Sequence, residues 1–234
     1  PKEIFESIDF TQACAANEIS RQTVADILAK HSLGDYLGTV WSNVQAVLNA
    51  PLDGSLPGFT LGALEKCDRM MELEFTFHMA GVAAPRMAEI FREQGGPELD
   101  PHFPERLGRL QFNPRDGFMR GFIDLLFRHE GRYYILDWKS NRLGPDDAAY
   151  TPARLQGVMT TEFYTLQYHV YTLALHLHLG QRLLDYDLDK HIGGAFYIFT
   201  RGIDSDTRGI FFDRPNRALI EALAAEFQLG PQAT

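Results

Sequence analysis

Residues 121–139 read Gly121-Phe-Ile-Asp-Leu-Leu-Phe-Arg-His-Glu-Gly-Arg-Tyr-Tyr-Ile-Leu-Asp-Trp-Lys139 and predict two β-strands joined by a tight turn. Both arms are rich in β-branched and aromatic residues, and the turn falls at Glu130-Gly131, where glycine tolerates a positive φ. In a register centred on that turn, residue 129 lies opposite 132 and residue 127 opposite 134. Continuing the same register sets Asp124 directly across from Asp137.

Two carboxylates in this position call for a cation. Cross-strand neighbours have Cβ atoms about 5 Å apart and project to the same side, so two like charges there repel each other. Lys139 follows Asp137 by two residues, and the alternation of a strand puts its ammonium group on the same face. Two carboxylates and one amine suit a hard divalent cation that takes oxygen ligands. The hairpin therefore predicts a hydrolytic metal site.

A solvated strand face is the alternative interpretation, because Asp and Lys two residues apart are common on such faces. Here, however, the polar trio interrupts two otherwise apolar strands, at 122–127 and 133–136. Apolar side chains on both faces predict a strand that is buried on both sides, where an unpaired carboxylate is costly. This context favours the metal site.

Four motifs, in order along the chain, resemble the nuclease domain at the C-terminal end of RecB proteins, within the PD-(D/E)XK nuclease superfamily. Phe-Glu-Ser-Ile-Asp-Phe at 5–10 matches near the start of that domain, and the hairpin with its flanks, 117–144, resembles its nuclease motif. Residues 164–175 resemble the Q-x-x-x-Y helix, and residues 193–202 resemble the last hairpin of the sheet. The likeness spans nearly the whole chain.

The resemblance implies an α/β fold with a restriction-endonuclease-like PD-(D/E)XK core, in which helices flank a mixed central β-sheet, and a mainly helical N-terminal part. We expect a single nuclease domain over residues 1–234, with residues 1–100 mainly helical plus one strand and residues 101–234 forming the catalytic core. The implied activity is Mg²⁺-dependent hydrolysis of DNA phosphodiesters, of the exodeoxyribonuclease V type, in double-strand break processing and recombinational repair.

The resemblance also implies roles for individual residues. Asp124 and Asp137 would hold Mg²⁺ together with the backbone carbonyl of Trp138. Lys139 would orient a water molecule or neutralise developing charge. Two further catalytic residues on the helix, Gln167 and Tyr171, would flank the metal site and position phosphate or the attacking water. The alternative for this pair is an amide and a phenol at a core boundary, hydrogen-bonded to backbone.

Candidate DNA contacts lie around the hairpin. The net charge of −9 argues against a general nucleic-acid binder, since phosphate contacts need Lys and Arg, but a local basic track remains compatible with it. The predicted DNA-binding residues are Arg115, Arg120, Arg142 and Tyr164. A solvated loop is the alternative interpretation of the basic stretch at 106–120.

Some positions depart from the family pattern or leave it open. The family has a His at the position of Lys2, and an ammonium group cannot ligate a metal while protonated, so weaker metal affinity is expected. Trp138 stands where relatives often have Tyr, on a side chain expected to point away from the site. Glu74 could lend a further acid, because the family has a Glu near this place, but a solvent-facing role is favoured.

The partners implied by the resemblance are double- and single-stranded DNA, RecC-like and RecD-like subunits, and a RecA-like recombinase. The chain has no G-x-x-x-x-G-K-[ST] loop, so the helicase part of a RecB-like protein is not expected in it. Lys2 and the acidic surface favour a rival function, a catalytically weakened nuclease fold that docks partner subunits or a recombinase. A site-specific endonuclease of the same superfamily is a third option.

Cysteine content and hydropathy exclude other classes. Cys14 and Cys67 are too few for a disulfide framework or for the four-thiolate iron–sulfur cluster of some relatives. The sequence has no run of eighteen apolar residues and opens on no signal peptide, so we expect a cytoplasmic protein that makes no membrane contact.

Periodicity predicts the remaining elements. Helices are expected at 20–29, 35–50, 85–94 and 218–228, the last capped by Asn216, and a long helix should begin at Thr160 or Thr161. Strands are expected at 71–79, 195–199 and 209–212, and a loop at 97–114. The predicted buried stripe of the long helix comprises Phe163, Leu166, Val170, Leu173, Ala174 and Leu177.

Overall fold

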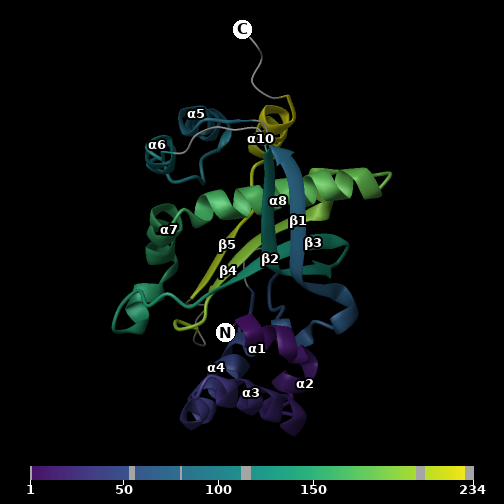
Figure 1. The fold of residues 1–234 in the computed structure, drawn as a ribbon, viewed down its shortest axis with the longest axis vertical. Helices are drawn as coiled ribbons and strands as arrows, with labels where there is room; N and C mark the ends of the chain where they lie inside the picture. The colour runs from purple at the N-terminus through teal and green to yellow at the C-terminus, as the bar shows by residue number, and fades with distance from the viewer. Residues whose placement is uncertain (1, 53–55, 80, 112–116, 204–208, 230–234) are drawn as a thin grey trace.

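A computed structural model describes residues 2–52, 56–79, 81–111, 117–203 and 209–229. Within these residues, five strands form one sheet in the order β1-β2-β3-β4-β5 (Figure 1). Their bounds are β1 Arg69–Met79, β2 Gly117–His129, β3 Arg132–Lys139, β4 Ile192–Phe199 and β5 Ile210–Asp213. β3 and β4 run parallel and the other neighbours antiparallel, which confirms the predicted mixed sheet.

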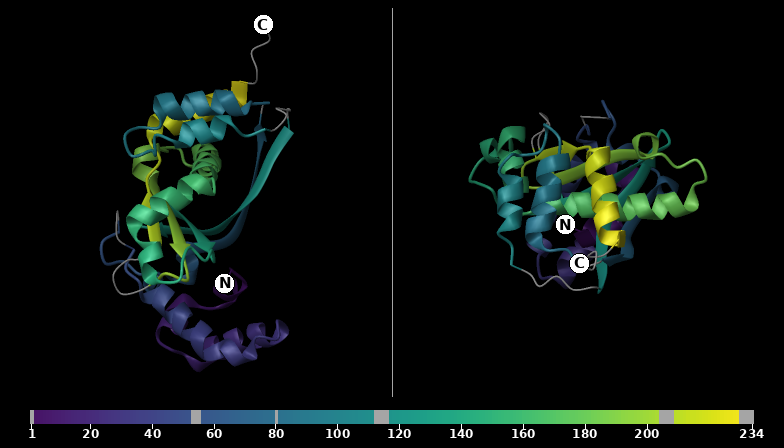
Figure 2. Two further views of the ribbon diagram at one scale, coloured as in Figure 1. Left: turned by 90° about the vertical axis from the view of Figure 1, so that its left-hand side faces the viewer. Right: turned by 90° about the horizontal axis from the view of Figure 1, so that it is seen from above.

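Helices cover both faces of the sheet (Figures 1 and 2). The N-terminal group is α1 Lys2–Ser7, α2 Phe10–Cys14, α3 Glu18–Lys30 and α4 Leu37–Asn49. The other helices are α5 Ala84–Gln94, α6 Phe103–Gly108, α7 Pro152–Thr161, α8 Tyr164–Arg182, α9 Leu188–His191 and α10 Arg217–Leu229. Short 3₁₀ turns lie at η1 Gly34–Tyr36, η2 Leu61–Ala63, η3 Lys66–Asp68 and η4 Asp147–Tyr150.

Two hydrophobic cores lie on opposite faces of the sheet. One joins α1–α4 to β3 through Tyr134, Leu136 and Trp138, and Trp138 stacks on Phe5 of α1 with ring centroids 4.1 Å apart. The other joins α5–α8 and α10 to Ile135 and its neighbours. β3 is therefore buried on both faces, as its continuous apolar run predicts.

The β2–β3 hairpin has the predicted register. Its ladder runs from His129 opposite Arg132 to Leu125 opposite Leu136, and both turn residues have positive φ, 48° at Glu130 and 78° at Gly131. The ladder stops one step before Asp124 and Asp137, because β2 continues beside β1 alone. The two carboxylates thus lie where β2 parts from β3.

The β1–β2 ribbon turns over next to Asp124. Met71 packs against the core shared with α1–α4, whereas Leu73, two residues along the same strand, packs against the core beneath α8. Glu72 between them has a φ of 49°, in the left-handed region that few non-glycine residues adopt. The β1–β2 register sets Glu72 beside Asp124, so the change of face occurs at the carboxylate.

Two predictions about element boundaries were wrong. α3 begins at Glu18 with Asn17 as its N-cap, and Ser20 lies buried inside the helix. The predicted loop at 97–114 contains α6, whose Phe103 and Leu107 are fully buried. Local turn signals in that stretch are thus overridden by tertiary packing.

The long helix also differs from its prediction. It starts at Tyr164, because Phe163 adopts a φ of 56° and separates it from α7. The predicted stripe holds at Leu173 and Ala174, while Phe163, Leu166, Val170 and Leu177 are only partly buried. Its buried residues also include Thr165, Tyr168, His169, Tyr171, Thr172, Leu175 and Leu179. A helix packed between a sheet and further helices buries more than one stripe, which periodicity alone does not reveal.

Candidate active site

Asp137 and Lys139 lie on the face of β3 that looks toward α8. The Lys139 Nζ is 2.6 Å from Oδ1 of Asp137 and donates a hydrogen bond of 3.0 Å to Oε1 of Gln167. The side chains of Asp137 and Lys139 are only 6% and 11% exposed. The i, i+2 spacing therefore brings an acid and an amine together in a nearly dry site, as the alternation of β3 predicts.

Gln167 connects this pair to two phenols. Its Nε2 donates to the hydroxyl oxygen of Tyr171 at 2.8 Å, and the hydroxyl of Tyr197 donates to its Oε1 at 3.0 Å. Lys139 Nζ also lies 4.0 Å from the ring centroid of Tyr164, within cation–π range. The alternative in which Gln167 and Tyr171 bond to backbone is wrong, because these hydrogen bonds join side chains.

Asp124 is held by two donors from different layers of the fold. Its Oδ2 accepts a hydrogen bond of 3.1 Å from the backbone N–H of Trp138, and its Oδ1 lies 3.0 Å from Nζ of Lys2 in α1. The same ammonium group lies 2.8 Å from Glu72 and 3.9 Å from Glu6. Lys2 thus occupies the centre of an acidic group that the first helix, β1 and β2 build together.

Glu72 is a site residue that the sequence did not single out. The solvent-facing role favoured for Glu74 is confirmed, because its side chain is 47% exposed, pairs with Arg120 at 2.6 Å and lies outside the acidic group. Both residues occupy the same face of an alternating strand, so only the β1–β2 register can choose between them. The long connection from Met79 to Gly117 leaves that register unspecified in the sequence.

The charges in the site perturb one another. Burial raises the pKa of Asp137 to about 6, and the nearby charge of Asp124 adds to the rise while Lys139 opposes it. Burial alone would lower the pKa of Lys2, but its hydrogen bonds to Glu72 and Asp124 outweigh that and raise the pKa. Four carboxylates, those of Glu6, Glu72, Asp124 and Asp137, face two ammonium groups and leave an excess of negative charge.

This donor set fits a divalent cation in its chemistry. In the part of the chain that the structure describes, no three His, Cys, Asp or Glu side chains are already gathered to hold an ion. The oxygen donors that could do so are Asp124, Asp137 and the carbonyl of Trp138. The carbonyl of Lys139 accepts a hydrogen bond from the backbone N–H of Thr200, just after β4, so strand alternation directs the carbonyl of Trp138 to the other side, toward Asp124. Hard oxygen ligands in an acidic setting match Mg²⁺.

The predicted DNA contacts are spread over the molecule. Tyr164 lies inside the site, where its hydroxyl donates to the Asn141 side chain at 3.2 Å. Arg120 is exposed on β2, paired with Glu74, and Arg142 is exposed just after β3. Arg115 falls outside the described residues. The structure thus brings Tyr164, but neither Arg120 nor Arg142, into contact with Lys139.

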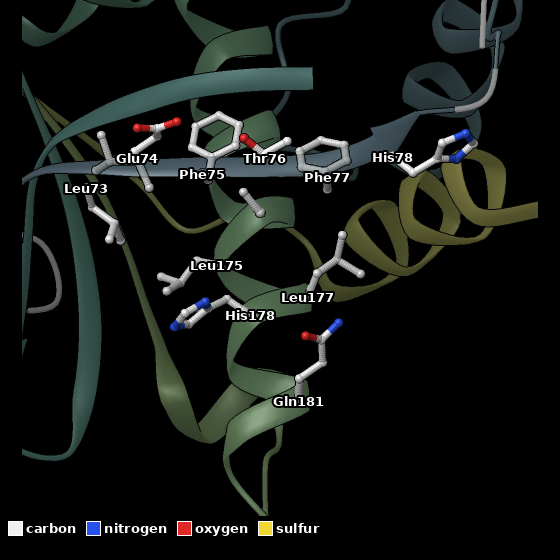
Figure 3. A pocket seen from close by; sticks show the side chains of 12 residues that line it. Leu73, Glu74, Phe75, Thr76, Phe77, His78, Leu175, Leu177, His178 and Gln181 are labelled. Carbon is white, nitrogen blue, oxygen red and sulfur yellow. The ribbon is translucent and has the colours of Figure 1, made fainter. Parts of the chain in front are cut away.

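A pocket of about 430 Å³ lies elsewhere, between β1 and the C-terminal half of α8 (Figure 3). Residues 73–78 of β1 line it together with Leu175, Leu177, His178 and Gln181 of the helix. It includes none of the side chains that surround Lys139. The acidic group is therefore separate from this pocket.

No helix within the described ranges combines the length and apolar character that crossing a membrane requires. Cys14 is partly buried and Cys67 exposed, and neither forms a disulfide.

Comparison with known proteins gives a consistent result. The sequence model of a family described as the PD-(D/E)XK nuclease superfamily matches residues 42–228. The RecBCD enzyme subunit RecB of Escherichia coli (strain K12) is 38% identical over 226 residues, which are 96% of this chain and 18% of that protein. The corresponding subunits of Haemophilus influenzae and Mycolicibacterium smegmatis are 43% identical over 127 residues and 35% identical over 201 residues. These matches cover 54% and 75% of this chain, and 10% and 18% of the relatives.

Proposed function

Because this chain belongs to the PD-(D/E)XK nuclease superfamily, we propose that it hydrolyses DNA phosphodiester bonds as the nuclease part of a RecB-like protein. The observation that carries the proposal is the convergence of Asp124, Asp137, Lys139 and Gln167 from two strands and a helix. Lys139 lies 2.6 Å from Asp137 and 3.0 Å from Gln167, in a site that excludes most water.

In this proposal Asp124, Asp137 and the carbonyl of Trp138 would hold Mg²⁺. The ion would supply positive charge that lowers the pKa of a water molecule and offsets charge on the phosphate oxygens. Lys139 orients the attacking water or stabilises the charge that develops on the phosphate. The hydrogen bond from Lys139 to Gln167 fixes the position of the ammonium group. Tyr171 keeps Gln167 in place through the hydrogen bond of 2.8 Å.

The relatives are much longer than this chain, which spans 18% of the Escherichia coli protein. We therefore propose the wider role: exodeoxyribonuclease V activity in break processing and recombinational repair. The same proposal includes RecC-like and RecD-like subunits and a RecA-like recombinase as partners, DNA in both single- and double-stranded form as substrate, and the cytoplasm as the location.

A digestion assay tests the activity. The purified chain should degrade linear DNA in Mg²⁺ and stop in EDTA, with Ca²⁺ as a second control ion. Asp137→Ala and Lys139→Arg should each reduce the rate by about a thousandfold or more, because Arg cannot replace a compact ammonium group in this geometry. Normal degradation by Asp137→Ala would refute the proposal, and discrete fragments would indicate a site-specific endonuclease.

A docking module with little catalysis is the second candidate, and Lys2 favours it. Its ammonium group is 3.0 Å from Asp124, where it competes with any cation for the same carboxylate. If the chain binds RecC-like or RecA-like partners with no Mg²⁺-dependent digestion at any metal concentration, this candidate replaces the first.

A further inference from the structure

We propose that the outer half of the β1–β2 ribbon, residues 73–79 and 117–123, binds single-stranded DNA by stacking bases on Phe118 and Phe122 and leads the strand to Asp124. The proposal rests on the proposed nuclease function and names the form of substrate that approaches this site. It begins from two phenylalanines that the fold does not use.

Phe118 and Phe122 are exposed, whereas the aromatic residues on the other face of the ribbon pack against the core. Phe118 is 75% exposed and Phe122 43% exposed, and both lie on the solvent face of β2. Two large aromatic side chains on one strand face are a costly surface for a soluble fold, and such patches commonly mark binding sites. In the unliganded chain, Phe118 has an edge contact with His78, and Phe122 lies under the guanidinium of Arg120 at 5.5 Å.

The opposite face of the same ribbon packs against the core beneath α8 and α10. Phe75 meets Tyr171 edge to face, with ring centroids 5.6 Å apart, and Phe77 lies 6.0 Å from Phe227 of α10. Gly121 lies under Phe75, and a Cβ there would come within 2.4 Å of that ring. The exposed rings are therefore free for a ligand without disturbing the core.

The exposed face forms an ordered grid of side chains. In the β1–β2 register, Phe122 lies opposite Glu74, Arg120 opposite Thr76 and Phe118 opposite His78. Figure 3 shows the β1 members of this grid, Glu74, Thr76 and His78, following one another along the strand. A guanidinium thus stands between two aromatic rings, an arrangement that suits a phosphate between two stacked bases.

This face is continuous with the acidic group. The last member of this face on β2, Phe122, is two residues and about 7 Å along the strand from Asp124, where the ribbon turns over. The β1–β2 ribbon extends away from the rest of the sheet (Figure 2). Its end at Glu72 and Asp124 lies beside α1, whose Lys2 contacts both residues. A base stacked on Phe122 would therefore hold the neighbouring backbone close to the carboxylate.

Single-stranded DNA fits this surface better than duplex DNA or a peptide. In a duplex the base faces are stacked on each other and are not accessible to a protein ring, whereas unpaired bases stack on aromatic side chains without regard to sequence. The net charge of −9 provides little general attraction for phosphate, so stacking must carry much of the binding. A peptide would gain nothing from the continuity with Asp124.

The test measures binding in EDTA, where no cleavage occurs. Fluorescence anisotropy with labelled oligo-dT and with a blunt duplex of equal length gives both affinities. The double variant Phe118→Ala/Phe122→Ala should lose at least about tenfold in affinity for oligo-dT, with less than about twofold loss for the duplex. Phe118→Trp/Phe122→Trp should restore binding, because it keeps an aromatic face.

Two further variants sharpen the result. Tyr36→Ala removes an aromatic side chain that is 59% exposed in the N-terminal helices, and it should bind oligo-dT as the wild type does. Arg120→Gln should reduce the slope of log affinity against log salt by about 0.7, one phosphate contact, while the Phe variants leave the slope unchanged. Oligo-dT carrying 2-aminopurine should show quenched fluorescence on binding to the wild type and less quenching with the double variant.

The outcomes separate this inference from the proposed function. If the double variant binds oligo-dT normally, or loses duplex binding equally, the stacking platform is refuted even if the chain cuts DNA. If the chain cuts nothing but the double variant loses oligo-dT binding selectively, the platform stands and the nuclease proposal fails. If the double variant loses binding of a RecA-like or RecC-like protein and keeps that of oligo-dT, the surface is a protein interface and the inference is overturned.

Discussion

The Nζ of Lys2 lies 3.0 Å from the Oδ1 of Asp124, so the first helix delivers a cation to a carboxylate expected to bind a metal. The same ammonium group lies 2.8 Å from Glu72. The positive charge of Lys2 therefore already offsets part of the negative charge of the acidic group. A divalent ion at Asp124 must either displace Lys2 or tolerate a like charge beside it.

Replacing Lys2 by Met should strengthen divalent binding. Removing a positive charge a few ångströms from the ion should raise Ca²⁺ affinity by about tenfold or more, and Lys2→His should raise it further if the imidazole ligates. Isothermal titration with Ca²⁺ measures this without turnover. Lys30→Met removes an exposed lysine from the end of α3 and should leave the affinity unchanged. Equal or weaker binding by Lys2→Met would contradict the competition.

Glu72 and Glu74 should respond differently to the same change. Both are exposed glutamates on one face of β1, but only Glu72 shares Lys2 with Asp124. Glu72→Gln should raise the half-saturating Mg²⁺ concentration for cleavage by about fivefold or more, because the acidic group loses a charge. Glu74→Gln, whose partner is Arg120, should keep it within about twofold. Equal effects of the two variants would remove Glu72 from the site.

Asp137 should make the metal-free chain less stable as the pH rises. Its pKa rises from 3.8 to about 6 on folding, so between these values the folded chain keeps a proton that the unfolded chain has released. Stability contributed by this proton is present below about pH 4 and is lost by about pH 6, a change of about 3 kcal/mol.

Asp137→Asn removes this dependence and should be more stable than the wild type above pH 6. Urea unfolding in EDTA across that range measures the difference, which should vanish near pH 4 because the protonated acid resembles the amide. Asp35→Asn, on an exposed residue, serves as the control and should track the wild type. A difference that stayed constant with pH would show that the carboxyl of Asp137 titrates normally.

Gln167 should act on the rate and not on metal affinity. It accepts hydrogen bonds from Lys139 and Tyr197 and donates to Tyr171, so Gln167→Met releases the ammonium group from its fixed position. We expect kcat to fall by about 10- to 100-fold, with Ca²⁺ affinity within about twofold of wild type. Tyr171→Phe should have a smaller effect, since it removes a single hydrogen bond. A loss of Ca²⁺ binding in Gln167→Met would mean that the helix shapes the metal ligands themselves.

Local rules predicted the part of the site that lies within one hairpin. A tight turn at Glu130-Gly131 fixes the register, and alternation then places Asp137 and Lys139 on one face. The Q-x-x-x-Y resemblance pointed to Gln167 and Tyr171, and in the structure Gln167 bonds to Lys139 and Tyr171 bonds to Gln167. These relationships need only short-range geometry or a motif.

Contacts that join distant segments were beyond local rules. Glu72 reaches the site through a strand register that no tight turn sets, and Lys2 reaches it because α1 packs on the far face of the sheet through Phe5 and Trp138. The sequence shows Lys2 as a departure from the family pattern, but it does not reveal that the ammonium group contacts both Glu72 and Asp124. The helix α6 was missed for a similar reason, since the burial of Phe103 and not local propensity stabilises it.

Because the β1–β2 ribbon exchanges its faces at Glu72, a mutation in its outer half need not disturb the half that adjoins Asp124. Inserting a single residue in β2 between Met119 and Phe122 would exchange the two faces of residues 117–119. Phe118 would then point toward α8, and Gly117 and Met119 would point into water. Asp124, on the near side of the insertion, would keep its bond to Trp138. A register shift of this kind would change the side chains that the outer ribbon exposes to a ligand, while the residues around Asp124 stay in place. Binding and catalysis in such a protein are therefore able to evolve separately.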